Sequence, residues 1–441
     1  MEVKKMEKKE KIENFILIFL ISITFLSYFF GFYFDENSAG GGKGDFLNHT
    51  LKNLRLFNNN DLFDAFKIAV TDSSSEMFQS SRIPGFYIFN KVLNPFTDNP
   101  LYFRMSILFL SLLVPIIFYL ALCLKFKNIK KIYLFFLSTL ILLSPYFRTS
   151  AIWGNEENLA YLAFVTSYFF ILKYLDIRSD RRNFFLILVI FFSSLCVYFD
   201  QKFTIIPAIC FLMIYLNEKR LKNKILVILL YSLFAVPVLY LIYIWGGFLP
   251  PMDQIGRDVH LGKYNFQNLG YAITIISFYL APFIVCLLLN KDEKRIINLN
   301  NKNDIYIYGL SICYIIFFLF FYDISNEILL GKGVVYKFAI LITDNNLFQK
   351  FLISISILVA VVFILKLFEN TLINYLIIFF LILTPILYKP ILQEYFDPLI
   401  LLLIFTFFKT RFKINFKNLM VLFIYFTLFL SFTNIYYSKI F

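Results

Sequence analysis

Long apolar runs recur along almost the whole chain and are separated by short polar segments. A run of about 20 apolar residues is long enough to cross a bilayer core of about 30 Å as a helix. The pattern therefore predicts an all-α, polytopic transmembrane protein with about 13 spans. The expected spans cover residues 15–34, 105–124, 132–147, 159–176, 184–199, 203–217, 225–246, 268–290, 305–322, 351–368, 372–388, 396–408 and 419–436.

Composition leads to the same class of protein. Of the 441 residues, 59% are hydrophobic and 16% are charged, and the mean hydropathy is +0.72. A soluble protein cannot place that much apolar surface inside one core. We expect one integral membrane domain over residues 1–441, with a cytoplasmic tail at 1–14, a first extracytoplasmic loop at 35–103 and the remaining bundle at 104–441.

The basic residues gather in connections that alternate along the chain. Lys and Arg concentrate in connections that share one side of the membrane, and the positive-inside rule places that side in the cytoplasm. We therefore expect a cytoplasmic N-terminus, an extracytoplasmic active face and, as the location, a bacterial inner (plasma) membrane. This topology accounts for the net charge of +13 without nucleic-acid binding. The basic segments are Met1–Glu13, Lys125–Lys131, Lys173–Asn183, Asn217–Lys224, Lys291–Asp304 and Lys409–Asn418.

The first extracytoplasmic loop, residues 35–103, carries its own helical signals. Leucines at helical spacing predict an amphipathic helix over Phe46–Asn58 on the membrane surface, with Asp45 as its N-cap. A second helix is expected over 61–70. The Pro-Gly pair within 82–87 then predicts a break before the chain re-enters the membrane.

Asp35 and Glu36 stand where the first span leaves the bilayer. Acidic residues are unfavourable at the C-terminal end of a helix dipole. Either the helix end simply becomes polar here, or the pair is kept for chemistry. A carboxylate near a low-dielectric boundary has a raised basicity, which suits a general base.

A second polar constellation lies between the third and fourth expected spans and contains Arg148, Trp153, Glu156 and Glu157. Trp153 is either an anchor at the membrane interface or a platform on which a sugar stacks. Glu157 begins a span, which is an unfavourable place for a charge unless the charge is used.

Basic residues of the outer connections are candidates for binding a lipid phosphate. We single out Lys202, Arg257 and Lys337 together with Arg148, although Lys202 fits a plain hairpin tip equally well. The chain contains no GxxxxGK[ST] phosphate loop and no Cys/His metal spacing. We therefore predict no metal site or cofactor from these patterns.

The order of these features resembles the GT-C superfamily of membrane glycosyltransferases. Asp35-Glu36 after the first helix is similar to the Asp-Glu pair of protein O-mannosyltransferases and lipid A aminoarabinose transferases. Pro84-Gly85-Phe86-Tyr87 is similar to the Pro-Pro-Gly-Leu-Tyr segment of dolichyl-phosphate-glucose transferases, and residues 153–157 resemble a second-loop acidic motif. One departure is Glu394, which stands where the late element of the family carries an Arg.

The resemblance implies a polyprenyl-phosphate sugar donor and a glycan, lipid or protein acceptor. It implies that Asp35 is the catalytic base, with Glu36 and Asp45 as competing candidates. Glu156, Glu157 and Trp153 would position the acceptor or a cation, and Arg148, Lys202, Arg257 or Lys337 would bind the lipid phosphate. A divalent cation is left open, because one branch of the superfamily uses a metal.

Two other functions fit a polytopic membrane protein with polar outer loops. An O-antigen or capsule polysaccharide polymerase usually has its largest loop in the middle or late part of the chain, whereas here the first loop is largest. A transporter of lipid-linked glycans is expected to carry charges inside its spans and two matching halves. We therefore rank the transferase first.

Overall fold

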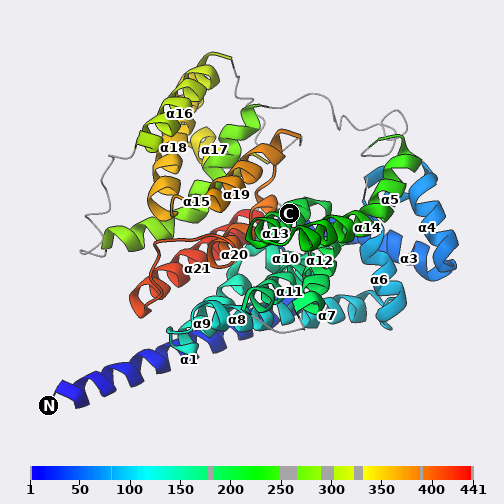
Figure 1. Ribbon diagram of the computed structural model, residues 1–441, viewed down its shortest axis with the longest axis horizontal. Helices are drawn as coiled ribbons and strands as arrows, with labels where there is room; N and C mark the ends of the chain where they lie inside the picture. The colour runs from blue at the N-terminus through cyan, green and yellow to red at the C-terminus, as the bar shows by residue number, and fades with distance from the viewer. Residues whose placement is uncertain are drawn as a thin grey trace. The chain divides into compact units, whose positions relative to one another are not determined.

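The computed structural model of the chain describes residues 2–80, 82–176, 182–247, 266–289, 302–321, 331–387 and 391–438. These residues are predominantly helical, and the strand-type pairing among them is one isolated bridge between Phe368 and Thr410. The prediction of an all-α protein is confirmed. The chain divides into two compact units, residues 1–258 with 426–441 and residues 259–425 (Figure 1). The expectation of a single membrane domain stays a prediction.

The first unit contains most of the helices and both polar constellations singled out from the sequence. Short 3-10 or π turns join several of its helices. Its elements are α1 (Glu2–Tyr33), α2 (Gly42–Asp45), η1 (Phe46–Thr50), α3 (Leu51–Asn59), α4 (Leu62–Thr71), α5 (Glu76–Ser80), α6 (Gly85–Leu93), α7 (Pro100–Ser111), α8 (Leu113–Lys125), α9 (Lys131–Thr139), η2 (Leu140–Leu143), α10 (Pro145–Trp153), α11 (Glu157–Asp176), α12 (Arg182–Phe199), η3 (Gln201–Thr204), α13 (Ile205–Asn217) and α14 (Leu221–Trp245).

The second unit is built from fewer described helices. The last helix of the chain, α21, begins in this unit and ends in the first. The elements are α15 (Gln267–Leu289), α16 (Lys302–Phe321), α17 (Gly333–Ile342), α18 (Asn346–Leu367), α19 (Leu372–Leu383), η6 (Thr384–Leu387), η7 (Gln393–Tyr395), α20 (Leu399–Phe405) and α21 (Phe416–Ser438).

In the part of the chain that the structure describes, eight helical segments are long and apolar enough to cross a membrane. This is the composition of a helical integral membrane protein. The eight are Glu7–Tyr33, Pro100–Lys125, Glu157–Asp176, Arg182–Phe199, Leu221–Trp245, Gln267–Leu289, Asn346–Leu367 and Phe416–Ser438.

The other expected spans coincide with shorter or broken helices. Around 203–217, 305–322 and 372–388 the apolar helices have 10 to 17 described residues. Within 396–408 the only helix is α20, whose 7 residues extend about 10 Å and cannot cross a bilayer alone.

The expected span at 132–147 is wrong as one straight helix. The axis bends by 69° between Lys131–Leu143 and Pro145–Trp153. Pro145 cannot donate a backbone hydrogen bond to the preceding turn. The Ser144 hydroxyl accepts from the Phe147 amide at 3.1 Å and so caps a new helix, α10. Much of the polar stretch that follows, up to Trp153, is therefore buried helix rather than loop.

The first loop departs from its prediction at the start of its helix. The helical run begins at Gly42 rather than Phe46, and Asp45 lies inside it without making a side-chain cap hydrogen bond. Asp45 as N-cap is therefore wrong. A Cβ on Gly42 would lie 2.2 Å from Thr149 Cγ2, so the first residue of the run packs closely on α10 and has no room for a side chain.

Part of the apolar face of this helix points into the protein, whereas Leu47 near its start is 47% exposed. Leu54 and Phe57 are buried. The Phe57 ring stacks on Tyr87 of α6, with the ring centroids 6.0 Å apart. The helix is amphipathic as predicted, but this part of its apolar face is used by the protein core, because α6 offers an aromatic surface to it.

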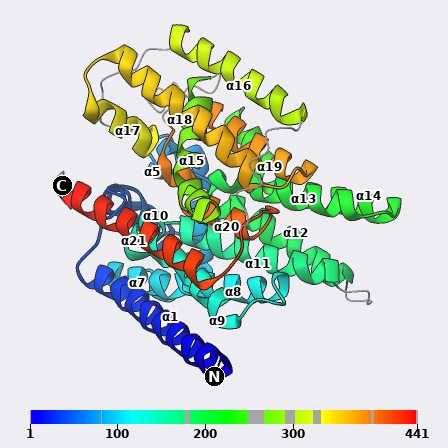
Figure 2. The same ribbon diagram turned by 90° about the vertical axis from the view of Figure 1, so that its left-hand side faces the viewer.

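Helix α1 lies alongside α9 and contacts α7 through Tyr28 and Phe29 (Figure 2). Near the C-terminal end of α1 the Tyr28 hydroxyl is 2.6 Å from the Ser111 hydroxyl at the end of α7. Toward the N-terminal part of α1, Tyr133 of α9 donates to Glu13 at 2.8 Å. Just beyond α1, Asp35 pairs with Arg104 in the first half of α7. Because Tyr28 contacts the end of α7 and Asp35 contacts its first half, α1 and α7 run antiparallel.

Most ion pairs between distant segments of the first unit fall into two layers at opposite ends of its helices. One layer joins Asp35 to Arg104, Glu36 to Arg148, Arg82 to Glu156 and Lys202 to Glu157. The other joins Lys130 to Glu10, Lys127 to Asp176 and Arg182 to Glu218. We call these the first and second polar layers.

Helix α11 runs from one layer to the other. Glu157 begins it in the first layer and Asp176 ends it in the second. Its 20 residues extend about 30 Å, the thickness of a bilayer core. The two layers divide the segments of this unit into the same two groups as the alternation of Lys- and Arg-rich connections in the sequence. Which layer faces the cytoplasm stays a prediction.

Gly85 provides a test of how the first-loop helices pack. A Cβ at this residue would lie 2.3 Å from the Tyr198 carbonyl oxygen of α12, and backbone cannot move aside easily. We predict that Gly85→Ala destabilises the protein by about 1–3 kcal/mol, measured by thermal unfolding in detergent. Gly44→Ala is the matched control, because its Cβ would meet nothing within 4 Å. Equal unfolding midpoints for the two variants would contradict the packing.

Candidate active site

Helix α1 ends in a turn that places Asp35 in a left-handed conformation. Asp35 has φ 51. The Glu36 amide donates to the Gly31 carbonyl at 2.8 Å and the Asp35 amide to Phe32 at 3.2 Å, the two bonds of a Schellman motif. Glycine is the usual residue at this position, and Asp and Asn are among the few others that adopt it. A carboxylate also meets the negative end of the helix dipole. Local structure therefore disfavours Asp35.

Arg104 of α7 holds Asp35 in place. Its Nη2 donates to Asp35 Oδ1 at 2.5 Å, while its Nε donates to the Ile152 carbonyl at 2.8 Å. The guanidinium carbon lies 4.0 Å from the centroid of the Trp153 ring. The Asp35 side chain is nevertheless 57% exposed. One carboxylate oxygen is thus oriented by a fixed cation, and the group as a whole stays accessible.

Glu36 has the opposite environment, although it is the next residue. Its two carboxylate oxygens accept from Nε and Nη2 of Arg148, at 2.9 and 2.5 Å. The Glu36 side chain is 11% exposed and that of Arg148 is 2% exposed. Arg148 also donates to the carbonyls of Ser27 and Leu142. The pair therefore clamps α1 to α10.

Gly31 is the residue of α1 that makes room for this clamp. A Cβ at Gly31 would lie 2.4 Å from Glu36 Oε2 and 2.7 Å from Arg148 Nη2. A larger residue would push the ion pair apart. The need for glycine here follows from close approach within a helix and not from backbone conformation.

The Trp153 side chain is hydrogen-bonded to the same turn. The side chain is buried, and its indole Nε1 donates to the Glu36 carbonyl at 2.9 Å. Arg104 covers one ring face, and Lys43 Nζ lies 5.8 Å from the ring centroid. Neither an exposed interface anchor nor an open stacking platform describes this environment.

A network of buried charges joins Glu156 and Glu157 to distant segments. Arg82 Nη1 lies 3.0 Å from Glu156 Oε1. Lys202 Nζ lies 3.2 Å from Glu157 Oε1 and 3.5 Å from Asp200 Oδ2. The Arg82–Glu156 pair and the Lys202–Glu157–Asp200 group therefore tie the first loop and the α12–α13 connection to the start of α11.

Burial changes the protonation of this network. It raises the pKa of Glu156 from 4.5 to about 8, which Arg82 opposes and the charges of Glu157 and Asp200 reinforce. Burial likewise raises the pKa of Asp200, against the charge of Lys202. Glu156 is therefore a carboxyl group that can hold a proton near neutral pH.

The remaining predicted residues are spread through the chain. Asp45 is half-buried in α2 of the first unit. Lys337 lies on α17 in the second unit, so it is not placed relative to Asp35. Arg257 lies outside the described residues. No group of three His, Cys, Asp or Glu in the described ranges could hold a metal ion.

Two arginines of this site were missed by sequence reasoning. Arg104 stands just before an expected span and Arg82 opens the Pro-Gly break. Arg104 carried a usable signal, because a charge at the edge of an apolar run is unfavourable unless it is paired. Its partner lies 69 positions away in the chain, and no local pattern identifies it.

Comparison with protein-family models, with curated proteins and with solved structures found no match for this chain.

The Glu36–Arg148 clamp predicts a large and specific loss of stability. Glu36→Gln leaves Arg148 charged and buried without its counterion, which costs about 3–5 kcal/mol, measured by unfolding in detergent. The double variant Glu36→Leu/Arg148→Met removes both charges and should recover much of that loss. Lys127→Gln breaks the exposed Lys127–Asp176 pair and should change stability by less than about 1 kcal/mol. A Glu36→Gln effect no larger than this control would contradict the clamp.

Glu156 predicts a pH dependence of stability. In the folded state it binds a proton up to about pH 8, whereas its ordinary pKa is 4.5. Between these values the folded state binds the extra proton, so stability falls as pH rises, by at most about 1.4 kcal/mol per pH unit. Glu156→Gln cannot titrate and should flatten this slope. An unchanged slope of the unfolding midpoint against pH in the variant would show that Glu156 is ionised throughout.

Proposed function

We propose that the protein is a GT-C-type glycosyltransferase with about 13 spans, which moves a sugar from a polyprenyl-phosphate donor to a glycan, lipid or protein acceptor. In this proposal the first polar layer, with Asp35, faces the extracytoplasmic side of a bacterial inner membrane. The N-terminus and the second polar layer face the cytoplasm, in accord with the positive-inside rule.

The conformation of Asp35 is the observation that carries the proposal. Its left-handed backbone is uncommon for a residue other than glycine, and its place at the end of the α1 dipole disfavours an acidic residue. Arg104 nevertheless orients one of its oxygens, and the side chain stays accessible. A carboxylate kept at an unfavourable position, held by a cation and open on its other side, has the features of a working general base.

The proposed step is a single displacement. An acceptor hydroxyl oxygen bonds to the anomeric carbon while the bond from that carbon to the phosphate oxygen breaks. The phosphate leaves with the bonding electron pair, and the hydroxyl proton passes to Asp35. The configuration at the anomeric carbon is inverted.

The neighbouring residues divide between positioning and binding. Glu36, Arg148 and Trp153 hold the Asp35 turn and are positioning residues in this account. Arg148 and Lys202 suit a lipid phosphate less well than the sequence implied, because carboxylates already engage their cationic groups. Lys43 is exposed beside Trp153 and is better placed to meet a phosphate next to Asp35.

A transporter receives less support. Its coupling charges are expected inside the spans, near the middle of the bilayer. The ion pairs of the first unit instead gather in two layers at the helix ends. No observation on the described residues favours a polysaccharide polymerase over a transferase that adds one sugar.

Sugar transfer by the purified protein tests the proposal. A panel of polyprenyl-phosphate sugars is offered to wild type, Asp35→Asn and Asp45→Asn in the presence of membrane-derived acceptors. Asparagine tolerates the left-handed conformation and can accept the Arg104 hydrogen bond, so Asp35→Asn should fold normally. Transfer should fall by about 10²–10⁴-fold, the usual contribution of a general base.

Asp45→Asn is the matched control and should transfer at the wild-type rate. If Asp35→Asn is folded and still transfers sugar at the wild-type rate, the base is another group. If wild type transfers no sugar from any donor while a repeat-unit substrate is polymerised, the polymerase is the better description.

A further inference from the structure

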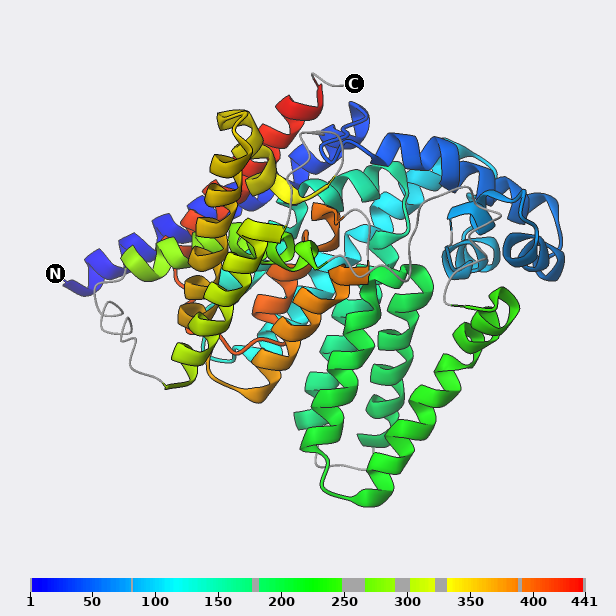
Figure 3. The same cartoon turned by 90° about the horizontal axis from the view of Figure 1, so that it is seen from above.

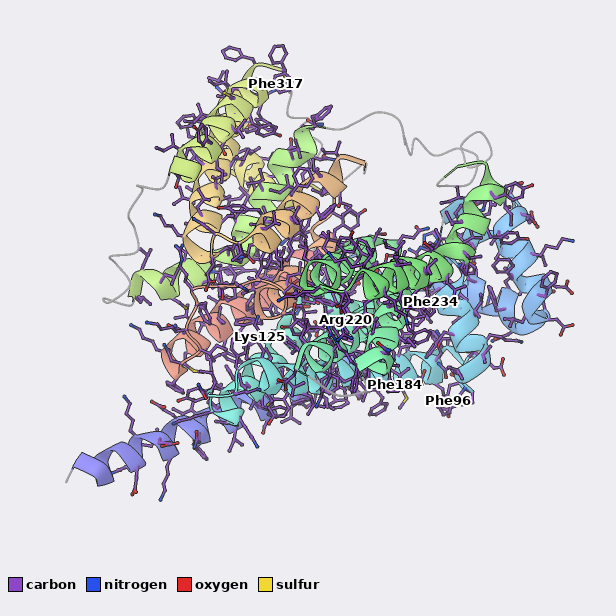
Figure 4. The ribbon with its side chains drawn as sticks, viewed as in Figure 1. Phe96, Lys125, Phe184, Arg220, Phe234 and Phe317 are labelled. Carbon is purple, nitrogen blue, oxygen red and sulfur yellow. The ribbon has the colours of Figure 1, made fainter. Side chains whose placement is uncertain are left out.

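The connection between α13 and α14 presents a group of cations at the end of a membrane helix. Lys219, Arg220 and Lys222 are exposed there. The Lys224 ammonium lies 4.5 Å from the centroid of the Tyr215 ring, which holds it beside the others. We call these four residues the basic collar. Figure 4 labels Arg220 within it, and Figure 3 shows α13 and α14, in green, meeting at one end of the helical hairpin.

The acidic residue beside the collar does not neutralise it, because its carboxylate is turned inward. Glu218 is buried. It accepts from the Lys219 and Arg220 amides, both at 3.0 Å, and from the Tyr174 hydroxyl and Arg182 Nη2 at 3.0 and 2.9 Å.

The Glu218 carboxylate thus stabilises the turn and joins α11, α12 and α13. Burial raises the pKa of Glu218, but these hydrogen bonds and the charge of Arg182 outweigh burial and lower it to about 2. Glu218 is ionised at neutral pH, and Arg182 is its counterion. The side chains that the collar turns outward are all cationic.

An apolar stripe on α14 begins at the collar. Leu221, Ile225 and Leu229 are 71%, 49% and 61% exposed. They are spaced by four residues and therefore share one helix face. Only 11% of the most apolar window of α14 is buried within the protein. A helix of this composition faces acyl chains, and the stripe extends from the collar into the bilayer core.

We propose that the basic collar and this stripe form a binding site for an anionic phospholipid of the bilayer. The collar meets the phosphate-bearing headgroup and the stripe meets an acyl chain, so an amphiphile with a negative head matches both parts. Clusters of Lys and Arg next to a membrane helix attract anionic headgroups in this way. The site belongs to the second polar layer, about 30 Å from the layer of Asp35, and it is independent of the proposed sugar transfer.

Binding of fluorescent phosphatidylglycerol to the full-length protein in neutral detergent micelles tests the site, with phosphatidylcholine of the same chain length as the neutral probe. The variant Lys219→Gln/Arg220→Gln/Lys222→Gln keeps the backbone bonds to Glu218 and should fold. Each cation contributes about fivefold in affinity, so phosphatidylglycerol should bind about a hundredfold more weakly. Lys8→Gln/Lys9→Gln/Lys11→Gln removes the same charge from the exposed start of α1 and should bind as wild type does.

Four results would overturn the proposal. Equal binding of the two phospholipids by wild type would leave no role for charge. Phosphatidylglycerol binding by the collar variant as tight as by wild type would leave no role for the collar. Equal loss of affinity in both triple variants would indicate bulk charge rather than a site. Binding of polyprenyl phosphate at the collar without binding of phosphatidylglycerol would assign the site to a different lipid.

Discussion

The end of α1 imposes the constraint on which the rest of the first unit depends. Two adjacent carboxylates stand at the negative end of a helix dipole, and one of them occupies a left-handed position where glycine is usual. Two arginines from separate helices form ion pairs with these carboxylates, Arg104 from α7 and Arg148 from α10. The packing of α7 and α10 against α1 therefore stabilises a helix end that is unfavourable on its own.

Pairing of charges between helices also accounts for the two polar layers of the unit. Charges are unfavourable in the apolar middle of a membrane protein, and they occur here at helix ends where a partner from another helix meets them. In the first layer Asp35 is the accessible member of a set whose other carboxylates are engaged and largely buried. In the second layer Glu218 is engaged and the cations are exposed. In our proposals one layer supplies a base, and the other presents a positive surface to lipid.

The sequence was sufficient for what is local and periodic. Hydropathy located the long helices, and helical spacing located the amphipathic helix that contains Leu54 and Phe57. The sequence did not predict the features that depend on contacts between distant segments. Residue 42 at the start of that helical run must be glycine because Thr149, far along the chain, packs against it. Arg148 suggested a phosphate ligand until Glu36, 112 positions away, was found to occupy its guanidinium. Asp35 and Glu36 look equivalent in sequence, and only their different partners separate them.

The central claim is that Asp35 is retained for its carboxylate and not for stability. The most direct measurement is sugar transfer by Asp35→Gly with and without added formate. Glycine fits the left-handed position without strain, and the vacated space opposite Arg104 can admit a small carboxylate. The account predicts a folded variant that is inactive alone and is partly restored by formate but not by chloride. Full activity without formate, or a folded variant that formate cannot restore, would contradict it.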